Sequence, residues 1–458
     1  MNKLTKSPDR LPLPRVLAFA GLNVPLAGVA LPLTVYLAPL YANEVGLGLE
    51  LTGLLFMLLR FWDIFTDPVL GIVVDRYQSR WGRVRHWIFM SAPILALATY
   101  FAYMPPREGV GPFYFVFWMF IFYIGFTLLQ TSRNAWVPAI AQDYDERSRL
   151  FFWPEMVGIT TMLILMALPA LLPILGYDLD RFEQVAAMGW VLIVAIPITV
   201  GLALLFVPDK PLKGAQAQQD KIDLAGVLKA VKNKLLGRVL AMELLIGTAV
   251  AITGSNYLFV TEYAFGLDDS ESSLVLMLFF IASILGMPFW LAVAKRTEKT
   301  VAFRGGCFLA AGAGILYYVT AQFGGFGPIL IGAVVNGFAF SAPIALTRSM
   351  TADVVELQVA DTGESRAGIY FALLSVAYKL GTSLAFGLGY LMVGQLAGFQ
   401  PGEANSDSAI HGLLLIFCII PAVLYLAGAW VSTRYPVTRA LQQEVALRLD
   451  PRGPMPLD

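Results

Sequence analysis

The sequence predicts an all-α membrane protein with twelve transmembrane helices, and three observations support this class. Of its 458 residues, 57% are hydrophobic and 14% are charged, against roughly 25% charged in soluble proteins. Apolar runs long enough to cross a bilayer recur along almost the whole chain. Lys and Arg gather in alternate connections between these runs, as they do in the cytoplasmic loops of membrane proteins. The net charge is zero, so we expect no nucleic-acid partner.

The expected spans fall into two halves of six. The N-terminal half covers residues 1–208 and the C-terminal half covers 238–433. A polar cytoplasmic loop, 209–237, separates them, and a cytoplasmic tail, 434–458, follows the last span. Residues 224–236 of the loop favour a short amphipathic helix on the membrane surface. The expected spans are 16–40, 51–74, 86–105, 112–140, 150–174, 186–208, 238–263, 272–294, 302–322, 326–348, 367–395 and 409–433.

The distribution of positive charge predicts the orientation. Both termini and the connections 75–85, 141–149, 209–237, 295–304 and 349–366, with their flanking residues, hold 27 of the 32 Lys and Arg. The opposite side holds only Arg107 and Arg181. We therefore expect both termini in the cytoplasm. No small-residue cleavage site follows a short apolar core, so the first span is expected to remain uncleaved.

The second span carries charges that packing alone does not explain. Asp63 and Asp67 are four residues apart, so they share one helix face, and Arg60 lies on the same side. One charge at the centre of a spanning helix costs on the order of 3 kcal/mol. Two carboxylates in a dry place are best explained by a bound cation, either Na⁺ or a proton. The alternative is an Arg60–Asp63 pair that only neutralises itself.

The connection after the second span predicts a cytoplasmic gate. A glycine there allows two helices to approach closely, and an acid with several arginines can form a charge-relay latch. Anchoring by the positive-inside rule is the simpler explanation of the arginines. The spacing of Gly71, Asp75 and Arg76 resembles the loop signature of the major facilitator superfamily. The candidate gate residues are Gly71, Asp75, Arg76, Arg83, Arg85, Arg147 and Arg366.

The combined pattern of residues 60–87 resembles the glycoside–pentoside–hexuronide:cation symporter family, as do 143–147 and 366–379. The resemblance implies that Asp63 and Asp67 bind the coupling cation, with Thr66 and Thr127 supplying neutral oxygens. It also implies that Lys379 of the eleventh span faces these acids and competes with the cation or contacts substrate. The alternative for Lys379 is that it snorkels to an interface. We expect Na⁺ or H⁺ as coupling ion, no other cofactor, and a monomer in the bacterial inner membrane.

Two acids that sugar-transporting members use on substrate are replaced here by Ala27 and Gln130. Arg133 is predicted either to bind an anionic group or to pair with Glu155. The isolated acid Glu243 is predicted either to face Arg238 near the cytoplasmic end of its span or to belong to the site. The candidate residues for substrate binding or coupling are Lys379, Arg60, Trp62, Gln130, Arg133, Asn134 and Trp136.

The predicted function is cation-coupled secondary symport of a small polar solute, such as a sugar or glycoside, by alternating access. The missing sugar acids favour an alternative, a sodium-dependent carrier of lysolipids or other amphiphiles. A second alternative is a non-transporting membrane sensor. No phosphate-binding loop and no catalytic constellation are found, so we expect a transporter and not an enzyme.

Overall fold

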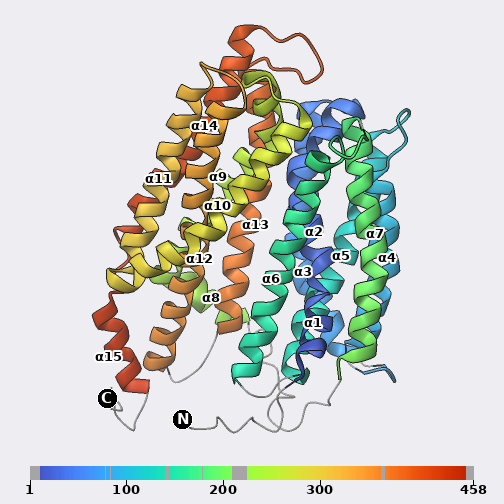
Figure 1. Cartoon of the computed structure of the whole chain (residues 1–458). Helices are drawn as coiled ribbons and strands as arrows, with labels where there is room; N and C mark the ends of the chain where they lie inside the picture. The colour runs from blue at the N-terminus through green and yellow to red at the C-terminus, as the bar shows by residue number, and fades with distance from the viewer. Residues whose placement is uncertain are drawn as a thin grey trace. The chain divides into compact units, whose positions relative to one another are not determined.

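The computed structural model describes residues 11–77, 79–82, 84–140, 144–177, 179–208, 224–362 and 367–449, and these are almost entirely helical (Figure 1). Lipid offers no hydrogen-bond partners, so an apolar segment must pair its backbone groups within itself, and the helix does this. Among the described residues the only β-type pairing is an isolated bridge between Ser79 and Gly82. The chain forms two compact units, residues 1–219 and 220–458.

Unit 1 begins with a broken first span. Pro32 and Pro39 precede two π-helical turns, because a proline offers no N–H to continue the regular helix. The later helices of the unit are longer and continuous. The elements are α1 (Leu13–Ala20), α2 (Asn23–Pro32), η1 (Leu33–Leu37), η2 (Leu40–Glu44), α3 (Leu49–Arg76), α4 (Arg85–Tyr103), α5 (Pro112–Ile140), α6 (Tyr144–Leu171) and α7 (Arg181–Phe206).

Helix α5 contacts both α3 and α4 within unit 1, and α4 also contacts α7. Gly189 of α7 allows the last of these contacts, since an added Cβ would lie 2.7 Å from the Cβ of Tyr103. A capping box at Asp180 and Glu183 fixes the start of α7. Arg107, which follows α4, pairs with Asp180 at 2.9 Å, so these two connections lie at one end of the unit.

Unit 2 repeats the pattern of long helices after a short surface helix. The elements are α8 (Leu224–Lys232), α9 (Lys234–Phe259), η4 (Val260–Ala264), α10 (Asp269–Arg296), α11 (Lys299–Thr320), α12 (Phe326–Thr362), α13 (Ala367–Leu391), η5 (Met392–Leu396), α14 (Asp407–Ser432) and α15 (Arg439–Leu449).

Close helix contacts form the interior of unit 2. Helix α9 contacts α13 and α14, while α12 contacts α10 and α11. Gly381 of α13 faces the backbone carbonyl of Leu244 so closely that no Cβ would fit between them. Gly337 of α12 faces the Phe279 carbonyl of α10 in the same way. Glycine is therefore required at both positions by space and not by backbone conformation.

The predicted surface helix at 224–236 is present but shorter. It ends at Lys232, because Asn233 caps the next helix by accepting the backbone N–H of Leu235 at 2.9 Å. Leu228 and Val231 lie three residues apart on α8, and both side chains are exposed.

The C-terminal tail packs against unit 2. The Tyr435 hydroxyl donates to the Met350 carbonyl of α12 at 2.9 Å. The backbone N–H of Arg439 bonds to the Glu298 carboxylate, with the nearer oxygen at 3.1 Å. Val445 of α15 is buried. Burial of Tyr435, together with the nearby Asp353 carboxylate, raises the pKa of its phenol.

Ten helices of the described part are long and apolar enough to cross a membrane. The two further expected spans correspond to α3, with 28 residues, and α4, with 19 residues. Helix α3 is long enough to span, at about 42 Å against a core of about 30 Å, but its central charges lower its hydropathy. The all-α membrane class is therefore confirmed, while the count of twelve and the cytoplasmic termini stay predictions. Helix α12 differs from the expected 326–348 and continues to Thr362, because no proline or glycine interrupts residues 344–362.

Candidate functional site

The two acids of α3 meet one hydroxyl from α5. Thr127 Oγ1 lies 3.1 Å from Asp63 Oδ1 and 2.9 Å from Asp67 Oδ1. Thr127 and Asp63 are buried, while Asp67 is half-buried. The four-residue spacing thus places both carboxylates on the face of α3 that packs against α5.

A threonine hydroxyl carries one proton, so Thr127 can donate to only one carboxylate at a time. The second carboxylate can share the hydroxyl oxygen only if it is itself protonated, or if a cation lies between the oxygens. The arrangement therefore has room for one additional positive charge, either a proton or a small metal ion. Carboxylate and hydroxyl oxygens are the ligands that hard cations prefer.

Two further groups of α3 lie beside this cluster. Thr66 Oγ1 donates to the backbone carbonyl of Asp63 at 3.2 Å. Pro68 has no N–H, so the Ile64 carbonyl lacks its regular helical donor. This carbonyl is an oxygen that the sequence analysis missed, although Pro68 in the motif was the signal for it.

Arg60 belongs to a polar group one turn before the acids. Its guanidinium donates to Thr34 Oγ1 of η1 at 3.3 Å. The hydroxyl of Tyr123, from α5, lies within electrostatic reach of both Arg60 and Asp63. Arg60 thus interacts with groups of η1 and α5, so an ion pair with Asp63 alone does not describe its whole environment. Trp62, by contrast, is 52% exposed.

Arg133 lies in a second polar cluster between α2, α5 and α6. Its guanidinium donates to Asn23 Oδ1 and, at 3.1 Å, to Asn134 Oδ1. Asn23 in turn donates to the Pro154 carbonyl at 2.7 Å. The Glu155 carboxylate also attracts the guanidinium. Both predicted roles of Arg133 remain open, and Asn23, which the sequence analysis missed, is its main partner on another helix.

The other candidates of the first half occupy different environments. Trp136 is fully buried and packs edge-to-face on Phe19 at 6.2 Å, which favours a packing role. Gln130 is half-buried. Ala27 lies against α6, where an added Cβ on Gly158 would be 3.0 Å from its own Cβ.

Lys379 belongs to unit 2. It is half-buried near the middle of α13, and its backbone carbonyl accepts from Thr382 Oγ1 at 3.0 Å. Its predicted approach to the acids of α3 joins the two units and stays a prediction.

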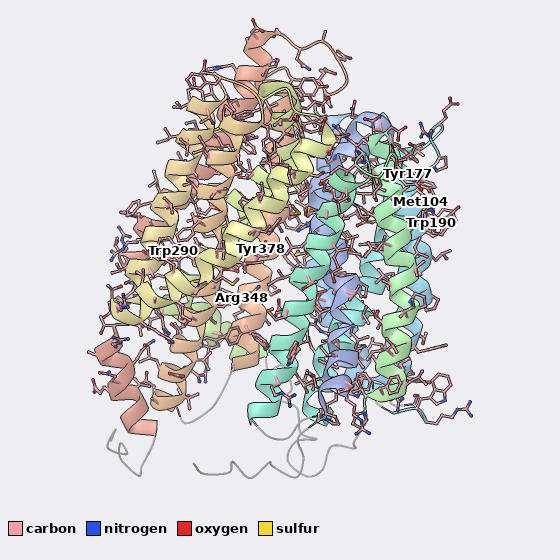
Figure 2. All side chains as sticks on the ribbon, viewed as in Figure 1. Met104, Tyr177, Trp190, Trp290, Arg348 and Tyr378 are labelled. Atoms are coloured by element: carbon pink, nitrogen blue, oxygen red, sulfur yellow. The ribbon has the colours of Figure 1, made fainter. Side chains whose placement is uncertain are left out.

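Glu243 is a buried acid of α9 with a defined partner. Thr347 Oγ1 of α12 donates to Glu243 Oε2 at 2.5 Å. Arg348, the next residue of α12 and labelled in Figure 2, attracts the same carboxylate. Thr347 is also fully buried. The pair links α9 to α12 and gives Glu243 a structural role within unit 2.

The gate residues are only partly described. Gly71 faces Thr131 of α5, whose Cγ2 would lie 3.8 Å from an added Cβ. The Arg85 guanidinium donates to the Leu204 carbonyl, which lies in the last turn of α7. Arg83 and Arg366 lie outside the described residues, and so do the side chains of Asp75, Arg76 and Arg147. The charge-relay latch therefore stays a prediction.

Within the described ranges, no three His, Cys, Asp or Glu residues come together as a metal-binding group. The site on α3 has two carboxylates, Asp63 and Asp67, and so falls below this number.

The fold of this chain is also found in a solved transporter structure. The helical arrangement is similar to the inward-open xylose transporter XylE from E. coli, with a TM-score of 0.63 at 12% identity. That similarity covers 95% of this chain and 98% of XylE. At this identity the similarity shows the fold of the chain.

The family model of MFS/sugar transport proteins matches residues 19–439, and the chain belongs to this family. The inner membrane symporter YicJ of E. coli is 24% identical over 87% of this chain and 86% of its own length. The isoprimeverose transporter of Lactiplantibacillus pentosus is 24% identical over 88% of this chain and 84% of its own. The resemblance to the glycoside–pentoside–hexuronide:cation symporters is thereby confirmed. The protein is a symporter of the sugar-transport type, integral to the inner membrane.

Proposed function

We propose that this symporter imports a sugar or glycoside together with one Na⁺ or H⁺ bound between Asp63 and Asp67. Twelve spans, formed by the ten apolar helices with α3 and α4, would place both termini in the cytoplasm. The positive charge of the predicted cytoplasmic connections supports this orientation. The sugar-like substrate is supported by the family and by the similar isoprimeverose transporter.

The observation that carries the proposal is the Thr127 hydroxyl, which lies within hydrogen-bonding distance of both acids. Two carboxylates that share one donor repel each other until a cation arrives. A Na⁺ ion would take oxygens from Asp63, Asp67 and Thr127, with the Ile64 carbonyl as a further ligand. A proton would instead join the two carboxylates. Either ion would reduce the repulsion between the two carboxylates, and the experiment below distinguishes Na⁺ from H⁺.

Cation binding would favour the state that binds substrate. Thermodynamic linkage then requires the cation to raise substrate affinity by the same factor as substrate raises cation affinity. Lys379 would compete for the same acids when no cation is bound, which provides a route for releasing the cation.

The test uses the full-length protein in proteoliposomes. Uptake of a radiolabelled glycoside is measured with Na⁺ replaced by K⁺ and, separately, across a pH gradient. Asp63→Asn and Asp67→Asn should abolish dependence on the cation, while Glu50→Gln, in the exposed first turn of the same helix, should retain it. If both Asn variants keep cation-dependent uptake and cation-induced thermal stabilisation, the cation site is wrong.

A second candidate is a carrier of lysolipids or other amphiphiles. It is favoured by Ala27 and Gln130, since neither side chain can bind sugar hydroxyls as a carboxylate does. Stabilisation of the purified protein by lysolipids, with none by sugars, would support this candidate over the first. The transporter family of the chain favours both candidates over a non-transporting sensor.

A further inference from the structure

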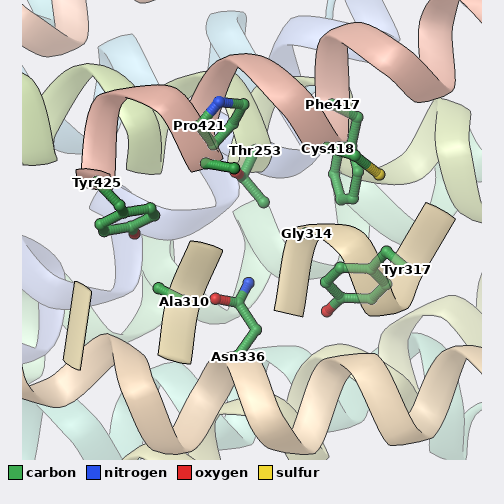
Figure 3. A pocket seen from close by; sticks show the side chains of 10 residues that line it. Thr253, Ala310, Gly314, Tyr317, Asn336, Phe417, Cys418, Pro421 and Tyr425 are labelled. Atoms are coloured by element: carbon green, nitrogen blue, oxygen red, sulfur yellow. The ribbon is translucent and has the colours of Figure 1, made fainter. Parts of the chain in front are cut away.

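A small cavity lies inside unit 2, among helices α9, α11, α12 and α14 (Figure 3). It is separate from the acids of α3, which belong to unit 1. Its wall mixes aromatic, aliphatic and polar side chains. Those that matter for the argument are Thr253, Tyr317, Asn336, Phe417, Pro421 and Tyr425.

Asn336 is the most polar group of the wall. Its carboxamide points from α12 into the space between the helices, and the Tyr317 hydroxyl lies near it (Figure 3). A carboxamide has two N–H donors and two acceptor lone pairs. One phenol hydroxyl can satisfy only part of this capacity. Thr253 adds an oxygen whose proton is already donated to the Ala249 carbonyl at 3.1 Å, so this oxygen can still accept.

Pro421 exposes a backbone acceptor in the same wall. A proline inside a helix has no N–H for the carbonyl four residues earlier, which here belongs to Phe417. Both residues line the cavity, so the freed carbonyl belongs to the turn of α14 that borders it. In a membrane interior a freed carbonyl needs a partner, which ordered water often supplies.

We infer that this cavity is a hydration site, in which one water molecule bridges the Asn336 carboxamide of α12 and the Phe417 carbonyl of α14. The space admits the centre of about one water molecule, which is the minimum a buried water needs. A stable buried water makes roughly two to four hydrogen bonds, and the polar groups of this wall can supply that number. The site would hold α12 and α14 together through a shared solvent molecule.

A metal ion in the cavity, or no occupant at all, would fit the wall less well than water does. A metal cation would lie in a wall without any carboxylate, and an uncompensated charge in the membrane interior is costly. A dry cavity would leave the amide and the freed carbonyl without full partners, whereas cavities that stay empty are lined by apolar groups. Water satisfies both groups without adding charge.

The test is hydroxyl-radical labelling of the full-length protein in detergent, read by mass spectrometry. Radicals formed from a bound water oxidise the side chains beside it. Tyr317 and Tyr425 should therefore be labelled several-fold more than Tyr390, although all three are buried. Tyr390 is a matched reference in the same unit, because its hydroxyl is satisfied by the Ser255 carbonyl at 3.0 Å.

Asn336→Leu keeps the branched shape of the side chain, removes the amide, and should reduce labelling of Tyr317 and Tyr425 to the level of Tyr390. Pro421→Ala restores the missing N–H to Phe417 and should produce the same loss, so it serves if the first variant does not fold. Equal labelling of all three tyrosines in the unmodified protein would overturn the inference. So would labelling that neither substitution changes.

Discussion

Replacing Thr127 by valine should weaken Na⁺ binding more than any other substitution of a single neutral group in the site. Valine keeps nearly the same shape and removes only the hydroxyl. That hydroxyl contacts Asp63 at 3.1 Å and Asp67 at 2.9 Å, so one change removes an oxygen of α5 that both acids share. Thr127 is 1% exposed, so bulk water cannot replace the lost oxygen freely.

The magnitude follows from the loss of one oxygen ligand to Na⁺. A polar contact to a charged group contributes about 1.5–3 kcal/mol. Valine also removes the hydrogen bond to the carboxylates, and that loss alone favours their protonation, so the weakening is expected for Na⁺ and not for H⁺. Since each 1.4 kcal/mol corresponds to a factor of ten, the Na⁺ dissociation constant should rise about 10- to 100-fold.

The assay is thermal stabilisation of purified protein across a Na⁺ titration, repeated across a pH series. Thr131→Val is the matched control, because Thr131 lies one turn further along α5 and contacts Gly71 instead of the acids. The control should keep the affinity of the unmodified protein. An unchanged affinity in Thr127→Val, or an equal loss in both variants, would refute the reasoning.

Three other substitutions test the packing around the candidate residues by melting temperature. Thr347→Val should destabilise unit 2 by about 1.5–3 kcal/mol, because it removes the hydrogen-bond donor to the buried Glu243 carboxylate. The control Thr351→Val loses only a hydrogen bond to a backbone carbonyl and should cost about 1 kcal/mol. Equal losses would contradict a special role for the Thr347–Glu243 pair. Lys299→Met should destabilise the protein by roughly 1–3 kcal/mol, because it removes the cationic partner of the Asp353 carboxylate, which is 2.6 Å away and 6% exposed. The control Lys295→Met, on the exposed surface, should change the melting temperature little. An unchanged melting temperature in Lys299→Met would show that the ion pair does not stabilise the fold. Gly381→Ala should destabilise the protein by about 1–3 kcal/mol, because the added methyl group separates α9 from α13. Gly368→Ala, on the same helix with open space around it, should leave the stability unchanged or raise it. A larger loss of stability in Gly368→Ala than in Gly381→Ala would mean that α13 packs differently.

The positions of the helices could be predicted because their signals are local. Apolar runs mark the spans, and the capping acids Asp180 and Asp268 begin α7 and α10 within a few residues of the expected starts. The shared face of Asp63 and Asp67 is likewise a property of one helix. The length of α12 has no such signal, because a helix continues through polar residues where no proline or glycine interrupts it.

Contacts between distant segments could not be predicted from one sequence. Asn23 and Arg133 lie 110 residues apart, and Glu243 and Thr347 lie 104 apart. No local pattern encodes which polar side chains of different helices meet, since that depends on the rotation of each helix about its axis. The sequence identified Arg133 and Glu243 as unusual, but their partners came from the packing.

The docked tail has a practical consequence for work on this protein. Tyr435 attaches the chain after α14 to Met350 of α12, and Arg439 attaches it to Glu298, between α10 and α11, while Val445 is buried. An affinity tag or fluorescent reporter should therefore be joined after Leu449, where the docked helix is complete. A shortened version that stops at Ser432 would uncover apolar side chains and invite aggregation during purification.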